Sequence, residues 1–421
     1  MEPKIRFNNN CWQKHKVGDL CDLLTGYPFP GDKILKRGKN LLMRGINITE
    51  GIIRHSDEID RYFNEDTIGL EKYRLQVGDL VIGMDGSKVG KNSALVTSKE
   101  NNSLLVQRVA RLRNEDKNLI NLIQIAVGSD KFIKYVEEMK TSSAIPHISP
   151  ADIRNFPLSL PEDSNERRFI ASYFTSLDSQ ISASTSRLAS LKQMKTASLQ
   201  AMFPQEGETV PKIRFKGFEE EWKKVMFSET FEFLKNNSLS RAELSNEGDI
   251  VNVHYGDVLI KYGDLLNIQN EELTFIADNK IGNTLYNSCH LQNGDIIIAD
   301  AAEDNTVGKC SEIVNICNKR VVSGLHTLPC RPLNRFAQGY LGHYINSESY
   351  HNQLLPLIQG SKISSISKKT LSQTIVLVPS IEEQKCIGNY FTSLDRKISL
   401  QSQRLEKLKQ IKSACLDKMF V

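Results

Sequence analysis

The sequence has no long apolar run and no closely spaced pair of cysteines. None of its apolar stretches approaches the ~20 residues that a helix needs to cross a bilayer, and the opening residues, MEPKIRFNNN, lack the apolar segment of a signal peptide. The eight cysteines form no CxxC pair, and Cys310, Cys317, His326 and Cys330 lack the paired spacing of zinc ligands. We therefore expect a cytoplasmic protein that keeps its thiols reduced and binds neither metal nor membrane.

Signatures of catalysis are also missing. The chain contains no GxGxxG after a strand, no Walker-type GxxxxGK[ST] and no Asn/Asp-Pro-Pro-Tyr/Phe loop of the kind found in methyltransferases. Glu138-Met139-Lys140 has the Glu-x-Lys form of many nucleases. It lacks a preceding Pro-Asp partner, and its surroundings favour a solvated helix face. The sequence therefore predicts a protein that is not an enzyme.

Charge is distributed unevenly along the chain. The net charge of +4 is small for 421 residues. Residues 204–304, however, hold 9 Lys and Arg against 19 Asp and Glu, whereas residues 305–381 hold 8 against 2. Such segregation can place a polyanion-binding face inside an acidic domain. It is also compatible with an ordinary solvated surface, so charge alone does not decide.

A repeat is the strongest signal in the sequence. YFTSLD occurs at 173–178 and again at 390–395, an offset of 217 residues, and the similarity continues through 181–203 and 398–420. The apolar residues in both copies are spaced by 4, 7 and 3, which is the seam of a helix packed along another helix. We predict that the two helices pair through Leu177, Ile181, Leu188, Leu191, Leu394, Ile398, Leu405 and Leu408.

Both helices are expected to begin in the same way. Asp163 with Glu166, and Ser380 with Glu383, have capping-box spacing, and each pair follows a proline. A continuous helix over 165–203 would be about 57 Å long.

Weaker similarities extend the repeat across the whole chain. Between these anchors residues 27–70 and 237–288 share almost nothing. Short β-branched runs indicate strands, and residues 118–140 and 334–358 are expected to be helical. The repeated pairs are PKIRF at 3–7 and 211–215, LQVGDLVIGMDG (75–86) with LQNGDIIIADAA (291–302), and IPHIS (145–149) with ISSIS (363–367).

This order predicts the direction of the helices. The second block begins where the first helix ends and ends where the second helix begins. A compact domain of its length is about 40 Å across, too short to bridge the ends of parallel helices about 57 Å long. We therefore expect an α+β protein with an internal pseudo-twofold repeat, in which long antiparallel helices separate two globular domains. The expected segments are 1–160, a helix in 161–203, 204–379, and a helix in 380–421.

The pattern resembles a known family. A variable block, a helix of the form NERRFIASYFTSLD…RL…LKQMK…LQAMF, and then PKIRF…W, all repeated, is similar to the specificity subunit of type I restriction–modification systems. The resemblance implies that each globular domain reads one half of an asymmetric bipartite site in double-stranded DNA. It also implies that the helices set the spacing and dock two methyltransferase subunits, with motor-nuclease subunits joining the complex. S-adenosylmethionine, ATP and Mg²⁺ would then bind the partners, not this chain.

Candidate DNA-binding residues lie near glycines and in the repeated loops. Lys and Arg side chains there suit phosphate contacts, and Asn47 could contact adenine through two hydrogen bonds. Lys91 and Lys309 occupy equivalent positions in the repeat, and His254-Tyr255 lies in a stretch that resembles a family loop. The full set is Arg44, Asn47, Lys88, Lys91, Ser143 and His147 in the first block, and His254, Tyr255, Lys309, Ser361 and Lys362 in the second.

One alternative stays open at this point. A two-headed scaffold that binds proteins through its heads and coiled coil would share the same repeat. It would bind no DNA, whereas a DNA-reading protein loses affinity steeply as salt rises.

Overall fold

The computed structural model describes residues 12–86, 88–139, 146–269, 271–360 and 363–419. Helices and mostly antiparallel strands alternate along the chain, so the α+β prediction is confirmed. Among the described residues, none of the helices combines the length and the apolar character that crossing a membrane requires.

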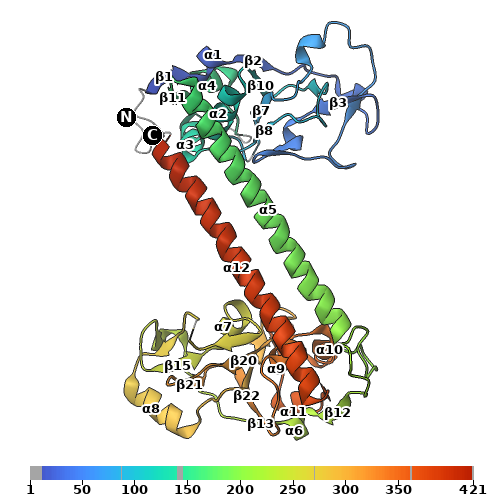
Figure 1. The fold of residues 1–421 in the computed structure, drawn as a ribbon, viewed down its shortest axis with the longest axis vertical. Coiled ribbons are helices and arrows are strands. Elements are labelled where there is room, and N and C mark those ends of the chain that lie inside the picture. The colour runs from blue at the N-terminus through green and yellow to red at the C-terminus, as the bar shows by residue number, and fades with distance from the viewer. Residues whose placement is uncertain (1–11, 87, 140–145, 270, 361–362, 420–421) are drawn as a thin grey trace. The chain divides into compact units, whose positions relative to one another are not determined.

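The chain divides into two compact units, and the division falls within its two longest helices (Figure 1). Unit 1 comprises Met1–Thr185 and Gln403–Val421, and unit 2 comprises Ser186–Ser402. Helix α5 spans Ser164–Met202 and helix α12 spans Ile381–Met419, so each unit holds a part of both. We call residues 12–161 head one and residues 204–379 head two.

The described residues of head one form four small sheets. Strand order is β2-β10-β7-β8 in the first, β6-β3-β9 in the second and β4-β5 in the third, while β1 pairs with β11. The elements are β1 (Trp12–Lys16), α1 (Val17–Leu20), β2 (Asp22–Thr25), β3 (Asn40–Met43), β4 (Ile48–Thr49), β5 (Ile52–Ile53), β6 (Tyr62–Phe63), β7 (Leu80–Gly83), β8 (Ser93–Leu95), β9 (Leu104–Leu105), β10 (Val109–Arg113), α2 (Lys117–Val127), α3 (Asp130–Met139), α4 (Pro150–Asn155) and β11 (Pro157–Pro161).

Head two repeats this plan with additions. Its main sheet has the order β13-β22-β18-β20-β16, and a second sheet has the order β14-β17-β15-β21. The elements are β12 (Lys223–Met226), α6 (Phe227–Thr230), β13 (Phe231–Phe233), β14 (Leu244–Ser245), β15 (Ile250–Val253), α7 (Tyr255–Ile260), β16 (Leu265–Asn267), β17 (Phe275–Ile276), α8 (Asn279–Ser288), β18 (Ile296–Ala299), β19 (Ala301–Ala302), β20 (Cys310–Val314), β21 (Arg320–Ser323), β22 (Thr327–Pro332), α9 (Tyr340–Ile345), α10 (Glu348–His351), β23 (Ser364–Ser365), α11 (Lys368–Ser372) and β24 (Ile375–Val378).

The second sheet shows that the fold is duplicated even where the sequence is not. Strand β3 pairs antiparallel with β6 and parallel with β9. In head two, β15 pairs antiparallel with β17 and parallel with β21. Strands β3, β6, β15 and β17 lie in the stretches 27–70 and 237–288, whose residues hardly agree. The strand pairing is therefore duplicated although the residues of these stretches are not.

The shared LQxGD motif has a structural role in both heads. Its strands β7 and β18 are buried along their whole length. The preceding Asp79 is buried and accepts two hydrogen bonds from Arg113, at 2.6 and 2.7 Å. Asp295 accepts the same two bonds from Arg331, at 2.9 and 2.7 Å. The motif thus ties the start of the central strand to the end of its neighbour.

The first turn of each long helix departs from the predicted capping box. The Ser380 hydroxyl accepts a hydrogen bond from the Glu383 amide, as predicted. The buried Glu383 carboxylate, however, pairs with Arg214 of the PKIRF segment at 2.7 Å. In the other copy the buried Glu166 accepts a hydrogen bond from Trp12. Each glutamate therefore joins its helix to the segment that enters the head, through Trp12 in the first copy and through Arg214 in the second.

Helices α5 and α12 lie side by side and run antiparallel within each unit (Figure 1). In unit 1, Asp178 pairs with Lys412, and Tyr173 contacts Cys415. In unit 2, the hydroxyl of Ser198 bonds that of Tyr390 at 2.9 Å, and Lys195 pairs with Asp395. The predicted antiparallel direction is confirmed in both.

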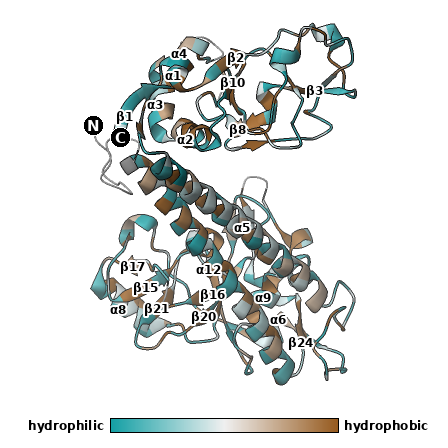
Figure 2. Cartoon of the chain, turned by 45° about the horizontal axis from the view of Figure 1, so that its top comes forward, coloured by the Kyte–Doolittle hydropathy of each residue, from teal (hydrophilic) through white to brown (hydrophobic). Residues whose placement is uncertain are grey.

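The eight residues predicted to pair the helices are all buried or half-buried. Hydrophilic and hydrophobic residues alternate along both helices in Figure 2. The heptad positions between the predicted residues hold the buried polar residues Ser184 and Gln401, which are equivalent in the repeat. The apolar pattern alone did not reveal these two positions.

Two predicted helices are interrupted. The described residues of the predicted helix 118–140 form α2 and α3, because α2 ends at its C-cap, Gly128. Residues 334–358 form the short helices α9 and α10 and a 3-10 turn. Gly339, at φ +82°, and Pro356 make one long helix unfavourable there.

Candidate nucleic-acid interface

Three loops meet at the end of strand β7 in head one. The amide of Met84 donates to the carbonyl of Arg108 at 2.9 Å, and the amide of Ile148 donates to the carbonyl of Met84 at 2.9 Å. Asp85 also forms a β-bridge with His147. We call residues 84–86, 107–108 and 146–148 the strand-end cluster of head one.

Head two builds the same cluster from equivalent residues. The amide of Asp300 donates to the carbonyl of His326 at 3.1 Å, and the amide of Ile366 donates to the carbonyl of Asp300 at 2.9 Å. Ala301 pairs with Ser365, as Asp85 does with His147. Residues 300–302, 325–326 and 364–366 form the strand-end cluster of head two.

Each cluster exposes, on a left-handed turn, a side chain that contacts an aspartate. Arg108 has φ +66° and pairs with Asp85 at 3.1 Å. His326 has φ +54°, and its Nδ1 lies 3.2 Å from Asp300. The side chain of Arg108 is 65% exposed and that of His326 is 50% exposed. Burial raises the pKa of Asp300 despite the opposing influence of His326 and Lys368.

Sequence reasoning missed both of these residues. Arg113 and Arg331 are equivalent in the folded repeat. Counting back five residues from each leads to Arg108 and His326. The shared arginine was therefore a usable signal, but nothing local marked the two exposed positions.

In head one, three predicted residues lie at or beside the strand-end cluster. His147 belongs to it and is exposed. Lys88 and Lys91 are exposed in the following loop, and Lys88 lies 3.9 Å from Glu50. Arg44 is half-buried, and burial, followed by the charge of Arg61, lowers its pKa.

Asn47 is placed differently from the prediction. Its side chain is 1% exposed and donates to the carbonyl of Arg54 at 3.2 Å and to Asp60 at 2.9 Å. Its amide oxygen accepts from the backbone of Arg44 at 3.3 Å. With its amide committed to these bonds, Asn47 is a structural residue of the turn and is not available to a base.

In head two, Lys309 also has a structural position. Its ammonium group donates to the carbonyls of Leu259 and Tyr262 at 2.8 and 3.3 Å. Burial lowers its pKa, against the opposing charge of Asp264. The equivalence of Lys309 with Lys91 therefore does not extend to exposure.

His254 and Tyr255 lie beside the second cluster. His254 is buried and caps helix α7 by accepting from the Gly256 amide at 3.2 Å. Burial, followed by the charge of Arg241, lowers its pKa. Tyr255 packs edge-on against the ring of His326, with centroids 5.3 Å apart. The remaining predicted residues, Ser143, Ser361 and Lys362, lie outside the described residues.

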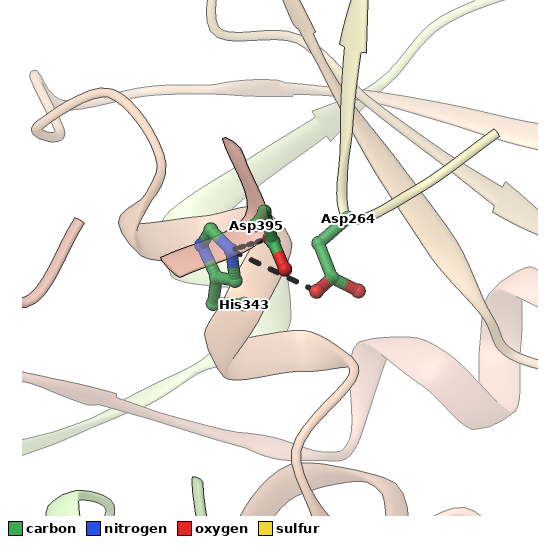
Figure 3. Close-up of side chains that lie close together, drawn as sticks. All are labelled: Asp264, His343 and Asp395. Carbon is green, nitrogen blue, oxygen red and sulfur yellow. Dashed lines mark hydrogen bonds and ion pairs between the residues drawn. The ribbon is translucent and has the colours of Figure 1, made fainter. Parts of the chain in front are cut away.

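A second polar group lies where head two meets the long helices. Asp264, His343 and Asp395 place one nitrogen and two carboxylates within 4.8 Å of one another (Figure 3). His343 Nε2 lies 2.8 Å from Asp395, and its Nδ1 lies 2.5 Å from the carbonyl of Gly339. This donor set suits a divalent metal.

Lys195 explains this group without a metal. Its ammonium bonds Asp264 at 2.7 Å and also pairs with Asp395. Burial opposes its charge, but the two carboxylates outweigh burial and raise its pKa. Burial likewise opposes ionisation of Asp395, but His343 and Lys195 together lower its pKa. Lys195 thus stands where a cation would sit, and the group joins head two to both helices.

Comparison with known proteins accounts for this double architecture. The model of the type I restriction modification DNA specificity domain matches residues 9–193 and again 219–410. The chain belongs to this specificity family. Each match holds one head together with most of the long helix that follows it. The family resemblance inferred from the repeat is thereby confirmed, and recognition of DNA sequence is the family's role.

Two curated relatives are specificity subunits, and they differ in identity and in the share of each protein that is aligned. The chain is 30% identical over 162 residues to the type I restriction enzyme EcoAI specificity subunit of Escherichia coli, a match that covers 37% of this chain and 27% of that protein. It is 19% identical over 357 residues to the MjaVIII specificity subunit of Methanocaldococcus jannaschii, covering 80% and 77%. The aligned stretch therefore spans less than a third of the E. coli protein.

Solved structures share the fold over the full length. The S subunit of a type I restriction–modification system from M. genitalium aligns with a TM-score of 0.62 at 17% identity, covering 100% of this chain and 99% of that one. A chain from a structure titled as the basis of complex assembly and conformational transition of the type I R-M system aligns with a TM-score of 0.52 at 17% identity, covering 99% and 98%.

Proposed function

We propose that this chain reads a bipartite sequence in double-stranded DNA, with one half-site per head. The observation that carries the proposal is that the specificity-family model matches twice, once for each head. The two strand-end clusters support it, because each gathers exposed polar side chains on loops held by a rigid strand. The side chains themselves differ, so the two half-sites are expected to differ and the target to be asymmetric.

Phosphate contacts are proposed to differ between the heads. The loop after β7 carries exposed Lys88 and Lys91, which suit phosphate oxygens. The loop after β19 instead carries exposed Glu303 and Asp304. Head two would therefore approach phosphates through another surface, and the exposed Lys368, whose charge acts on Asp300, is a candidate for it.

The long helices are proposed to set the distance between half-sites. Each has 39 residues, which corresponds to about 58 Å at 1.5 Å per residue. Two heads joined by such helices would contact half-sites separated by base pairs that neither head reads.

We also propose that methyltransferase subunits dock on exposed apolar residues of the helices. Met194 and Ile411 are equivalent in the repeat and are 51% and 37% exposed. Met202 and Phe203 are less suitable because they are buried in the core of head two. The methyltransferases would bring S-adenosylmethionine, and motor-nuclease subunits that join the complex would bring ATP and Mg²⁺. This chain then performs no chemistry itself.

Methylation mapping tests the proposal. The chain is produced in cells with and without its cognate methyltransferase subunit, and methylated positions in the genomic DNA are sequenced. A bipartite motif that requires both proteins is the expected result. Exchanging residues 1–160 for another head should change one half of that motif only. A chain that acts as a protein scaffold would produce no motif and no salt-dependent DNA affinity.

A further inference from the structure

We propose that Arg108 and His326 are the equivalent base-reading residues of the two heads. The inference rests on the proposed DNA recognition and names the side chains that make part of it sequence-specific. Arg108 would select a guanine in one half-site. His326 would select a base that presents an amino group, adenine or cytosine, in the other half-site.

The equivalence comes from the backbone, where sequence similarity is weak. The carbonyl of each residue accepts from the first residue after the buried central strand, Met84 or Asp300. The carbonyl of that residue accepts in turn from Ile148 or Ile366. Both parts of the shared framework, the LQxGD strand and the Ile-Ser stretch, thus converge on one exposed turn position in each head.

Arg108 and His326 both have a left-handed backbone conformation, which indicates that their side chains have a role. A left-handed φ is unfavourable for residues with a Cβ, and glycine or asparagine relieves the strain. Among the described residues, the chain uses Asn at the left-handed positions 102 and 315 and Cys at 317, but Arg and His at these two. Both side chains are largely exposed, so core packing does not explain their presence. Strained residues of this kind concentrate at functional sites.

An aspartate holds each side chain in place before DNA arrives. Asp85 accepts one N–H of the Arg108 guanidinium, which has five N–H groups in all. The others remain for a guanine, whose O6 and N7 match the spacing of two N–H donors. Holding the guanidinium in advance reduces the entropy lost on binding.

The same arrangement gives His326 a different preference. Its Nδ1 donates to the carboxylate of Asp300, so Nε2 of the neutral ring is an acceptor. An acceptor suits the N6 amino group of adenine or the N4 amino group of cytosine in the major groove. Tyr255 packs against the ring and fixes its plane.

The test uses the full chain assembled with its cognate methyltransferase subunit. Arg108→Gly and His326→Gly remove the side chains and suit a positive φ, so each variant should melt at or above the wild-type temperature. Arg108→Gly should relax a single guanine position in one half of the methylated motif and leave the other half unchanged. His326→Gly should relax a single adenine or cytosine position in the other half. Discrimination at each position should fall at least about tenfold.

Asn315→Gly is the matched control, because Asn315 is also left-handed and exposed in head two. Its motif should equal that of the wild type. A folded Arg108→Gly complex that keeps the wild-type motif overturns the inference. The inference is also overturned if the Arg108→Gly complex binds all duplexes of a series, each altered at a different base pair, with the same loss of affinity. A uniform loss is the mark of a phosphate contact. If the wild-type complex itself produces no bipartite motif, the proposed function fails instead.

Discussion

Arg113 donates two hydrogen bonds to the buried carboxylate of Asp79, and the same bond pair joins Arg331 to Asp295. Hydrogen bonding to the aspartate raises the pKa of each arginine above its ordinary value. Asp79→Asn breaks the ion pair and leaves a guanidinium without its counter-charge. We expect a loss of about 3 kcal/mol in the stability of head one. Hydrogen exchange resolved by peptide should show the loss in head one.

Asp295→Asn is the matched variant in head two. It should destabilise head two by a similar amount and leave exchange in head one unchanged. Equal losses in both heads from either variant would contradict the assignment of each pair to its own fold.

Lys195 and Lys412 provide a second comparison. They are equivalent in the repeat, but Lys195 pairs with two carboxylates in the group shown in Figure 3, whereas the partner of Lys412 among the described residues is the half-exposed Asp178. Lys195→Met should cost about 3 kcal/mol because it leaves two carboxylates short of a counter-charge. Lys412→Met should cost less than about 1 kcal/mol. Urea denaturation of the two variants gives this comparison, and similar losses would contradict it.

The same group has an expected pH dependence. The pKa of Asp395 lies below its ordinary value of 3.8 in the folded chain. Its contribution to stability is therefore complete above that value and is lost as pH falls through the lower, folded pKa. The melting temperatures of the wild type and Asp395→Asn should differ by a constant amount near neutral pH. They should converge as pH falls below about 4. A gap that widens on acidification would contradict the direction of the shift.

The pKa of Lys195, in contrast, lies above its ordinary value of 10.5. Its contribution is complete below that value and is lost only as pH rises through the higher, folded pKa. The melting temperature of Lys195→Met should therefore lie below that of the wild type by a constant amount between about pH 6 and about pH 9. A deficit that disappears within this range would be inconsistent with a charged Lys195.

Variants of Asn47 and Lys88 distinguish a structural role from a DNA-binding role in head one. Asn47→Ala removes three hydrogen bonds of a buried turn and should cost about 1–3 kcal/mol, with no change in the methylated motif. Lys88→Ala should hardly affect stability. It should weaken binding to all duplexes equally and reduce the slope of log affinity against log salt by about 1. Salt-titrated binding of the assembled complex distinguishes the two variants.

Periodic features were accessible to sequence reasoning. The offset of 217 residues placed Leu177 and Leu394 on matching helices, and the size of the block between the helices predicted that they run antiparallel. Such patterns are readable because a helix repeats its environment every few residues. The end of α2 at Gly128 and the start of α9 only after the left-handed Gly339 were missed.

The site was less accessible. Asn47 was chosen by residue type and Lys309 by its equivalence to Lys91 in the repeat, yet their polar atoms are already bonded to other groups of the chain. Asn47 bonds residues 7 and 13 positions away, and Lys309 bonds carbonyls about 50 positions away. No local pattern reports whether a side chain is already engaged by such partners.

The amino-acid order by itself determined the duplication, the two helices, their direction and the family, because each follows from spacing along the chain. Only the tertiary structure decided which polar residues face solvent and which support the fold. It also revealed the exposed, left-handed placement of Arg108 and His326, since backbone hydrogen bonds between three loops define their position and distant parts of the chain supply those loops. The exposure of a side chain and its hydrogen-bond partners depend on residues that are distant in the sequence, so neighbouring residues predict them poorly.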